Sequence, residues 1–135
     1  MSDRSARTVY LNGQYLSEKK ANISIFDRGF LMADGVYEVT SVLRSKLIDF
    51  DPHYLRLERS LRELDIVNPT NRDELLSVHR ELVAVNKINE GLIYLQITRG
   101  APGERDFEFP DCKSTPPTIV AFSQRKYHLL DNPVA

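Results

Sequence analysis

The sequence has a single cysteine, Cys112, and no tryptophan. One cysteine excludes an intrachain disulfide and any metal site built from several cysteines. The apolar runs are all far too short to span a bilayer, and the first residues carry no apolar signal-peptide core. We therefore expect a cytoplasmic protein without membrane association.

Neither positive nor negative charge predominates in the sequence. Eighteen Lys and Arg residues against nineteen Asp and Glu residues leave a net charge of -1, which gives no basis for binding nucleic acid or an anionic membrane. The three histidines, His53, His79 and His128, lack the spacing of metal-ligand pairs, so no metal site is predicted. The 135 residues, 41% of them hydrophobic, are enough for about one globular domain.

Alternating apolar and polar residues predict a sheet. Between residues 8–11 and 14–16, the pair Asn12-Gly13 predicts a β-hairpin. Further strands are expected at residues 23–25, 36–43, 47–50, 92–99 and 118–122, and the apolar run 92–99 is expected to be buried on both faces. Residues 100–117 form a long loop, and loops of this length in compact domains are usually functional or disordered.

Two helices are predicted within this set of strands. Asp51 as N-cap and Pro52 at the first helical position start one helix, and Thr70 with Asp73 resembles a capping box that starts the next. Apolar residues recur at helical spacing in both, as Tyr54, Leu57, Leu61 and Leu64 and then as Leu75, Val78, Leu82 and Val85. The pattern predicts an α+β fold, a mostly antiparallel sheet packed with two helices, in one small domain at residues 1–123. Residues 124–135 are interpreted as a linker.

The most informative stretch is residues 27–38, Asp-Arg-Gly-Phe-Leu-Met-Ala-Asp-Gly-Val-Tyr-Glu. Gly29 and Gly35 allow backbone angles that a side chain would forbid, and Tyr37 follows at the start of a strand, where a phenol is held rigidly. Each of these features, taken by itself, is also explained by an ordinary polar turn that leads into a strand. As a whole, the stretch resembles the N-terminal signature of the fold-type IV aminotransferases, which use pyridoxal 5′-phosphate (PLP), and most of all their D-amino-acid aminotransferase branch.

A second match to this family is the string His53-Tyr54-Leu55-Arg56-Leu57. Arg56 precedes an apolar-stripe residue and so lies on the flank of its helix, where a solvated arginine is the ordinary interpretation. A planar guanidinium can also hold two oxygens of a phosphate at once. The string resembles the H-x-x-R-L motif whose arginine binds the cofactor phosphate in the family, and this resemblance assigns that role to Arg56.

The third match is the strand and loop that include residues 93–110. It resembles the segment from which D-amino-acid aminotransferases place an arginine in the neighbouring subunit's site, where it binds the substrate α-carboxylate. Arg105 fits that arginine, and Phe107 stands where the family has a histidine. The resemblance implies a homodimer in which loop 100–117 reaches the neighbouring site. An ion pair of Arg105 with Glu104 or Asp106 is the structural alternative.

The resemblance also implies that Tyr37, Glu38 and Val39 line the substrate site, with Val39 facing the substrate side chain. Plain core packing is an equal alternative for Val39. His53 matches a family motif position, but we interpret it as a surface residue at the start of a helix, and His79 as a partly buried packing residue. Cys112 has no histidine or basic cluster beside it and is not predicted to be a nucleophile.

PLP chemistry needs a lysine that forms the Schiff base and an acidic partner for the ring nitrogen. In the family both lie in a second domain, and the resemblance covers only the N-terminal half of a typical member. No lysine of this chain has the context of the catalytic one: the six are Lys19, Lys20, Lys46, Lys87, Lys113 and Lys126. We interpret the chain as the N-terminal part of a truncated or cleaved aminotransferase, with the catalytic lysine expected beyond Ala135. The alternatives are aminodeoxychorismate lyase, branched-chain aminotransferase, or a non-catalytic binding domain that has lost its catalytic half.

Overall fold

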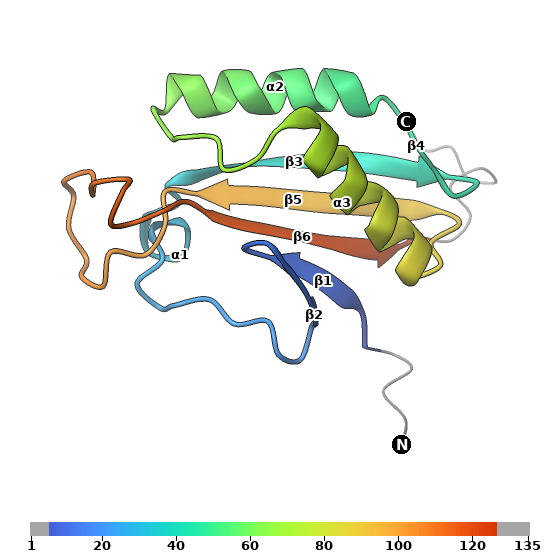
Figure 1. Cartoon of the computed structure of the whole chain (residues 1–135), viewed down its shortest axis with the longest axis horizontal. Helices are drawn as coiled ribbons and strands as arrows, with labels where there is room; N and C mark the ends of the chain where they lie inside the picture. Colours follow the sequence, from blue (N-terminus) through green and yellow to red (C-terminus); the bar gives the residue numbers. More distant parts are fainter. Residues whose placement is uncertain (1–5, 127–135) are drawn as a thin grey trace.

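A six-stranded antiparallel sheet carries two long helices on one of its faces (Figure 1). The computed structural model describes residues 6–126. In chain order the elements are β1 (Thr8–Leu11), β2 (Gln14–Ser17), α1 (Arg28–Met32), β3 (Gly35–Leu43), β4 (Lys46–Leu47), α2 (Phe50–Glu63), α3 (Arg72–Val85), β5 (Gly91–Thr98) and β6 (Thr118–Arg125). The predicted α+β class is confirmed.

The strand order is β2-β1-β6-β5-β3-β4, and every pair of neighbours is antiparallel. β3 pairs with β5 along its whole inner side, from Gly35 opposite Thr98 to Val42 opposite Gly91. On its outer side, β4 pairs with only Val42 and Leu43. The first half of β3 is therefore a free edge of the sheet in the described part of the chain.

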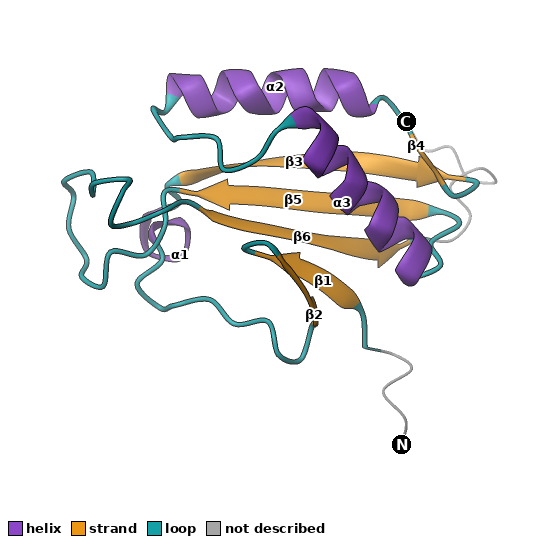
Figure 2. Ribbon diagram, viewed as in Figure 1, coloured by secondary structure: helices purple, strands orange, loops and turns teal. Residues whose placement is uncertain are grey.

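The two faces of the sheet differ because side chains alternate along each strand. Ile93, Leu95 and Ile97 of β5 are fully buried beneath α2 and α3, which add Leu57, Leu61 and Leu82 to the same core. Figure 2 shows both helices on this side of the strands, with α2 along the β3 edge. The opposite, open face carries a row of aromatic rings from Tyr37, Tyr94 and Phe122.

The hairpin prediction is confirmed. Asn12 and Gly13 link β1 to β2 with φ angles of 48° and 92°, the left-handed geometry that the tight hairpin turn requires and that this residue pair adopts readily. The strand expected at 47–50 is shorter than predicted, because β4 ends at Leu47 and Phe50 already belongs to α2.

Both helix starts differ from the prediction. α2 begins at Phe50 after Asp49 in the left-handed region, so Asp51 and Pro52 lie inside its first turn, where proline is tolerated. Burial of Phe50 in the core favours the earlier start. α3 is capped by Asn71, whose side chain accepts from the Glu74 amide at 2.9 Å. Asn71 with Glu74 thus forms the cap predicted for Thr70 with Asp73, one residue later.

Three further expectations are corrected, and one helix is additional to the prediction. Residues 23–25 form no strand, and their isoleucines are largely exposed. β5 is fully buried on one face and half-buried on the other, because no helix covers the open face. Leu64 and Val85 lie at helix ends and are exposed rather than in the core. A short helix that we did not predict, α1, begins after Asp27, whose carboxylate accepts from the Gly29 amide at 2.8 Å.

β6 continues to Arg125, beyond the strand end expected at residue 122. Residues 124 and 125 thus belong to the strand and not to the expected linker. The linker interpretation of the remaining tail stays a prediction, since residues 127–135 lie outside the described part of the chain. No helix within residues 6–126 is long and apolar enough to cross a membrane.

Candidate anion-binding site at the free edge of β3

Tyr37 and Glu38 are neighbours on the free edge of β3 and project to opposite faces of the sheet. Tyr37 lies on the open face and is 64% exposed, whereas Glu38 is 5% exposed beneath α2. Chemical groups from both faces are therefore available around one short segment of edge strand.

Arg56 of α2 holds the Glu38 carboxylate with two hydrogen bonds. Its Nε donates to Oε2 at 2.8 Å and its Nη2 donates to Oε1 at 2.9 Å. His53, one turn earlier on α2, places Nδ1 2.7 Å from the same Oε1. The H-x-x-R spacing, which puts both side chains on one side of the helix, brings them together on this carboxylate.

The Glu38 carboxylate stays ionised in this cluster. Burial by itself would raise the pKa of Glu38, but the hydrogen bonds from Arg56 and His53 outweigh it, and the pKa lies below its usual value. The same hydrogen bond to Glu38 raises the pKa of Arg56. Arg56 is 65% exposed, and its Nη1 has no hydrogen-bond partner within residues 6–126. The guanidinium is thus fixed in orientation and retains donors for an anion.

Tyr37 lies close enough to Arg56 for its phenol to contribute, as the smallest influence, to the raised Arg56 pKa. Its ring stacks on Tyr94 with centroids 5.6 Å apart, and Tyr94 stacks on Phe122 at 5.0 Å. Val39 follows on the same face as Tyr37 and is half-buried, outside the helix-covered core. The aromatic row holds the Tyr37 ring while leaving most of its surface exposed.

Arg105 and Phe107 lie on the loop between β5 and β6 and are both exposed. The Arg105 guanidinium carbon is 4.9 Å from the centre of the Phe107 ring. Within residues 6–126, Arg105 forms no ion pair with Glu104 or Asp106 and no hydrogen bond to Tyr37 or Arg56. Among the described residues, no hydrogen bond or ion pair joins this loop pair to the Tyr37, Glu38 and Arg56 group at the β3 edge.

The prediction missed a cluster of two buried arginines around one half-buried carboxylate, that of Asp34. The Asp34 carboxylate accepts from Arg28 Nε at 2.7 Å and from Arg99 Nε at 2.7 Å. Arg28 is the first residue of α1 and Arg99 directly follows β5, and both are buried. All three stand in strings used for the family resemblance, but nothing local in the sequence showed that they would meet.

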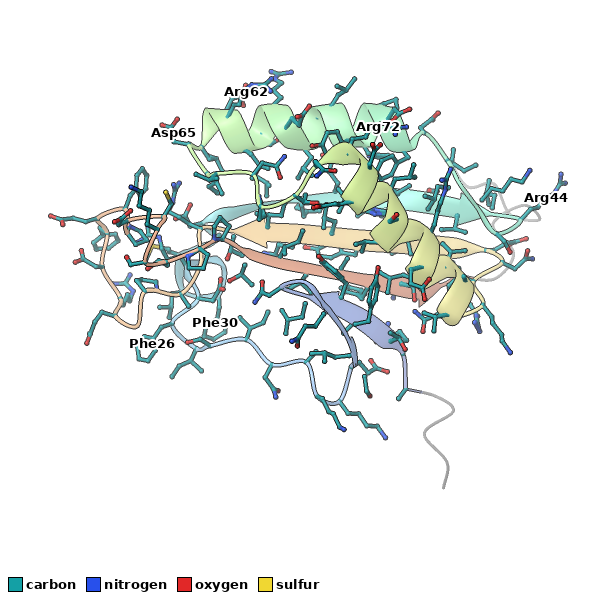
Figure 3. All side chains as sticks on the ribbon, in the orientation of Figure 1. Phe26, Phe30, Arg44, Arg62, Asp65 and Arg72 are labelled. Carbon is teal, nitrogen blue, oxygen red and sulfur yellow. The ribbon has the colours of Figure 1, made fainter. Side chains whose placement is uncertain are left out.

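A separate hollow lies elsewhere on the described part of the chain. It measures about 990 Å³ and is formed by the β3–β4 turn, the start of α2 and one side of α3, with Arg72 on its wall. A second hollow, of about 360 Å³, lies on the open face next to α1 and includes Gln96 and Val120. Figure 3 shows Phe26 and Phe30 on the side of the sheet away from the helices. No cluster of three potential metal ligands occurs within residues 6–126.

The fold and site define a class of protein: an α+β domain with an oriented arginine, a phenol and an exposed arginine-bearing loop around one end of a sheet. The chain belongs to the class IV aminotransferase family, which matches residues 35–133.

Curated relatives of the chain are D-alanine aminotransferases. The enzyme of Staphylococcus aureus (strain MSSA476) is 38% identical over 129 residues, covering 93% of this chain and 45% of the relative. That of Listeria monocytogenes serotype 4b (strain F2365) is 38% identical over 103 residues, covering 76% of this chain and 36% of the relative. The chain thus spans less than half the length of these relatives and corresponds to their N-terminal part.

Solved structures share the fold at lower identity. The branched-chain amino acid aminotransferase of Escherichia coli superimposes with a TM-score of 0.81 at 15% identity, over 90% of this chain and 40% of that one. The 4-amino-4-deoxychorismate lyase of Pseudomonas aeruginosa gives a TM-score of 0.66 at 23% identity, over 89% and 40%. At these identities the likeness extends to the fold alone.

Proposed function

We propose that this chain is the N-terminal half of a PLP-dependent aminotransferase that moves an amino group between a D-alanine-like amino acid and a 2-oxo acid. The observation that carries the proposal is the Arg56 guanidinium, held by Glu38 at the free β3 edge beside Tyr37. Membership of the family and the 38% identity to D-alanine aminotransferases support it.

The residues at the β3 edge fit the phosphate of PLP. Arg56 is exposed, charged and oriented, and its unused donors suit a phosphate oxygen. PLP, when bound, supplies the electron sink that stabilises a negative charge on the substrate α-carbon. Arg56 would anchor the cofactor through its phosphate and take no part in proton transfer, because it stays protonated.

Tyr37 and Arg105 would bind and orient the substrate carboxylate, Tyr37 as a phenol donor and Arg105 as a two-pronged donor. Val39, on the same face as Tyr37, would contact the substrate side chain. Glu38 was expected to line the substrate site, but its carboxylate lies on the other face. We assign it the role of holding Arg56 in place.

Arg105 is separate from the β3 edge within one chain, which suits a homodimer in which loop 100–117 serves the neighbouring site. Phe107 replaces the family's histidine and removes a hydrogen-bond donor from that loop. For this reason aminodeoxychorismate lyase and branched-chain aminotransferase activities stay as alternatives on the same fold. A non-catalytic binding domain is the alternative outside enzymes, and a cytoplasmic location remains our expectation.

The test uses the complete open reading frame. We expect the purified protein to bind PLP and to transaminate D-alanine with 2-oxoglutarate faster than L-leucine. Preference for L-leucine, or release of pyruvate from aminodeoxychorismate, would replace this proposal with one of the sister activities. Absence of PLP binding by the complete protein would point to the non-catalytic domain.

A further inference from the structure

One carboxylate, that of Asp34, joins two buried arginines at the end of the sheet. It accepts from Arg28 Nε at 2.7 Å, and from Arg99 Nε at 2.7 Å and Nη2 at 3.2 Å. The Arg28 and Arg99 side chains are only 3% and 9% exposed. Burial by itself would raise the pKa of Asp34, but the two arginines outweigh it and hold that pKa below its usual value, so the Asp34 carboxylate is ionised at neutral pH.

Each arginine uses its remaining donors on main-chain carbonyls of another segment. Arg28 Nη1 donates to the carbonyls of Asp106 and Glu108, the residues on either side of Phe107. Arg99 donates to the carbonyls of Leu64 at 2.7 Å and Asp65 at 3.1 Å, just after α2. In Figure 1, the loop between β5 and β6 lies at the same end of the sheet as α1 and the end of α2.

Phe109 closes this arrangement from the loop side. Its ring centre lies 3.8 Å from the Arg99 guanidinium carbon and 5.6 Å from that of Arg28, within the range of cation–π attraction. Phe109 itself is 65% exposed, so it contributes little to the core of the domain. Its contact with two buried cations ties the exposed loop to the end of the sheet.

The loop would otherwise have little to order it. Residues 101–114 are almost all exposed and belong to no helix or strand. Loops of this kind are usually mobile unless side chains fix them. The carbonyls that Arg28 holds adjoin Arg105 and Phe107 in the chain, so the contacts act directly on the segment that would bind substrate.

We propose that Arg28, Asp34, Arg99 and Phe109 form a latch that positions the 105–107 segment for substrate binding. The four are positioning residues, because they act through Arg105 and do not themselves reach the substrate. This inference rests on the substrate-binding role of Arg105 in the proposed function.

The first experiment measures loop order in this chain by ¹⁵N relaxation. In the parent chain, backbone order parameters of residues 105–108 are expected near the rigid value of about 0.85. Phe109→Ala should lower them toward the flexible range, below about 0.6, while leaving β3 and β5 unchanged. Phe109→Tyr, which keeps the ring, should restore the parent values. Leu55→Ala, at another exposed apolar residue, is the control and should change nothing in the loop.

The second experiment compares steady-state kinetics in the complete protein. Phe109→Ala should raise KM for the amino acid about tenfold to a hundredfold, since a misplacement of about 1 Å can reduce rates about a hundredfold. The affinity for PLP and its absorbance spectrum should stay unchanged. Phe109→Tyr should again behave as the parent. A domain that is merely destabilised would lose PLP and activity together, without this selective rise in KM.

The possible outcomes distinguish failure of the latch proposal from failure of the proposed aminotransferase function. Unchanged order parameters in Phe109→Ala and Arg28→Lys would overturn the latch, whatever the enzyme does. A mobile loop with unchanged KM would overturn the positioning role. If the parent protein has no transaminase activity at all, the proposed function fails before any variant is made, and the relaxation data still decide whether the latch exists.

Discussion

Arg56 and Glu38 form a two-pronged ion pair across the boundary between α2 and β3, with Nε–Oε2 and Nη2–Oε1 distances of 2.8 and 2.9 Å. Glu38 is buried and Arg56 is exposed, so the buried carboxylate holds the guanidinium in place at the surface. A planar pair of this kind restricts rotation of the arginine, which reduces the entropy lost when it binds an anion.

Replacing Arg56 with methionine in the complete protein should weaken PLP binding by about 2–4 kcal/mol, the scale of a lost charge-assisted contact to a dianion. Cofactor titration by absorbance measures this. Arg59→Met is the matched control, because Arg59 lies one turn further along α2 and, among residues 6–126, pairs only with Glu63, at 3.1 Å. Equal affinity in the Arg56 variant and the parent would show that the phosphate is held elsewhere.

Replacing Arg105 with alanine should raise KM for amino and 2-oxo acids while leaving the PLP spectrum unchanged, because Arg105 would bind the substrate carboxylate and not the cofactor. Steady-state kinetics with both substrates tests this. Arg62→Ala, at an exposed arginine of α2, is the control and should leave KM at the parent value. A changed cofactor spectrum in the Arg105 variant would contradict this assignment.

Mixed dimers test whether the loop serves the neighbouring site. Subunits that carry Arg105→Ala are combined with subunits that lack the catalytic lysine. Recovery of activity in the mixture is expected, since one of the two sites then has an intact lysine and an intact partner loop. No recovery would mean that each site is built within one subunit.

The 135-residue chain alone should fold but not catalyse. Its hairpin, capped helices and strands agree on one layered domain, yet no lysine is placed to form a Schiff base, and all six lysines are exposed. Treatment with PLP and borohydride, followed by mass spectrometry, should show scattered, low-level labelling of these lysines. Stoichiometric labelling of one lysine together with transaminase activity would overturn the expectation.

His79 should make the stability of the domain depend on pH. Burial lowers its pKa from 6.5 to about 4, and its Nδ1 lies 2.8 Å from the Leu75 carbonyl oxygen. The folded state therefore binds a proton less readily than the unfolded state, so this stabilising contribution is complete above pH 6.5 and is lost as the pH falls toward 4.

Between pH 7.5 and 5, the free energy of unfolding should fall by about 2 kcal/mol because of His79. Urea unfolding at a series of pH values measures this. His79→Leu should flatten the curve in this range. A slope unchanged in the variant would assign the dependence to other groups. Asp34 and Glu38, whose pKa values lie below the ordinary 3.8 and 4.5, should add to acid destabilisation as the pH falls through those ordinary values.

Features set by neighbouring residues could be predicted from the sequence. The Asn12-Gly13 turn depends on the backbone preferences of two residues, and the apolar stripe of α2 depends on helical spacing. The start of α2 was misplaced because tertiary burial of Phe50 decides it. The apolar run of β5 could not show that one face lacks a covering helix, since a continuous apolar run does not distinguish the two faces of a strand.

The same reasoning explains what was missed at the site. The flank position of Arg56 could be predicted from helical spacing, but its pairing with Glu38 depends on how α2 packs over β3. Asp34 and Arg99 are 65 residues apart in the sequence and meet only because β3 and β5 pair in register. Contacts of this range have no local pattern, so buried arginines resemble surface ones in the sequence.

The position of β1 next to β6 sets the order in which the chain can assemble during synthesis. The Asn12 amide donates to the Ile119 carbonyl, and the Asn12 side-chain oxygen accepts from the Ile119 amide, across 107 residues of sequence. The hairpin that is synthesised first therefore joins the sheet last. At roughly 5–20 residues per second, the ribosome needs on the order of 5–20 seconds to supply its partner strand. An isolated two-stranded hairpin is only marginally stable in water. The nascent hairpin therefore stays only partly formed until residue 121 is synthesised and pairs with Tyr10 in the sheet.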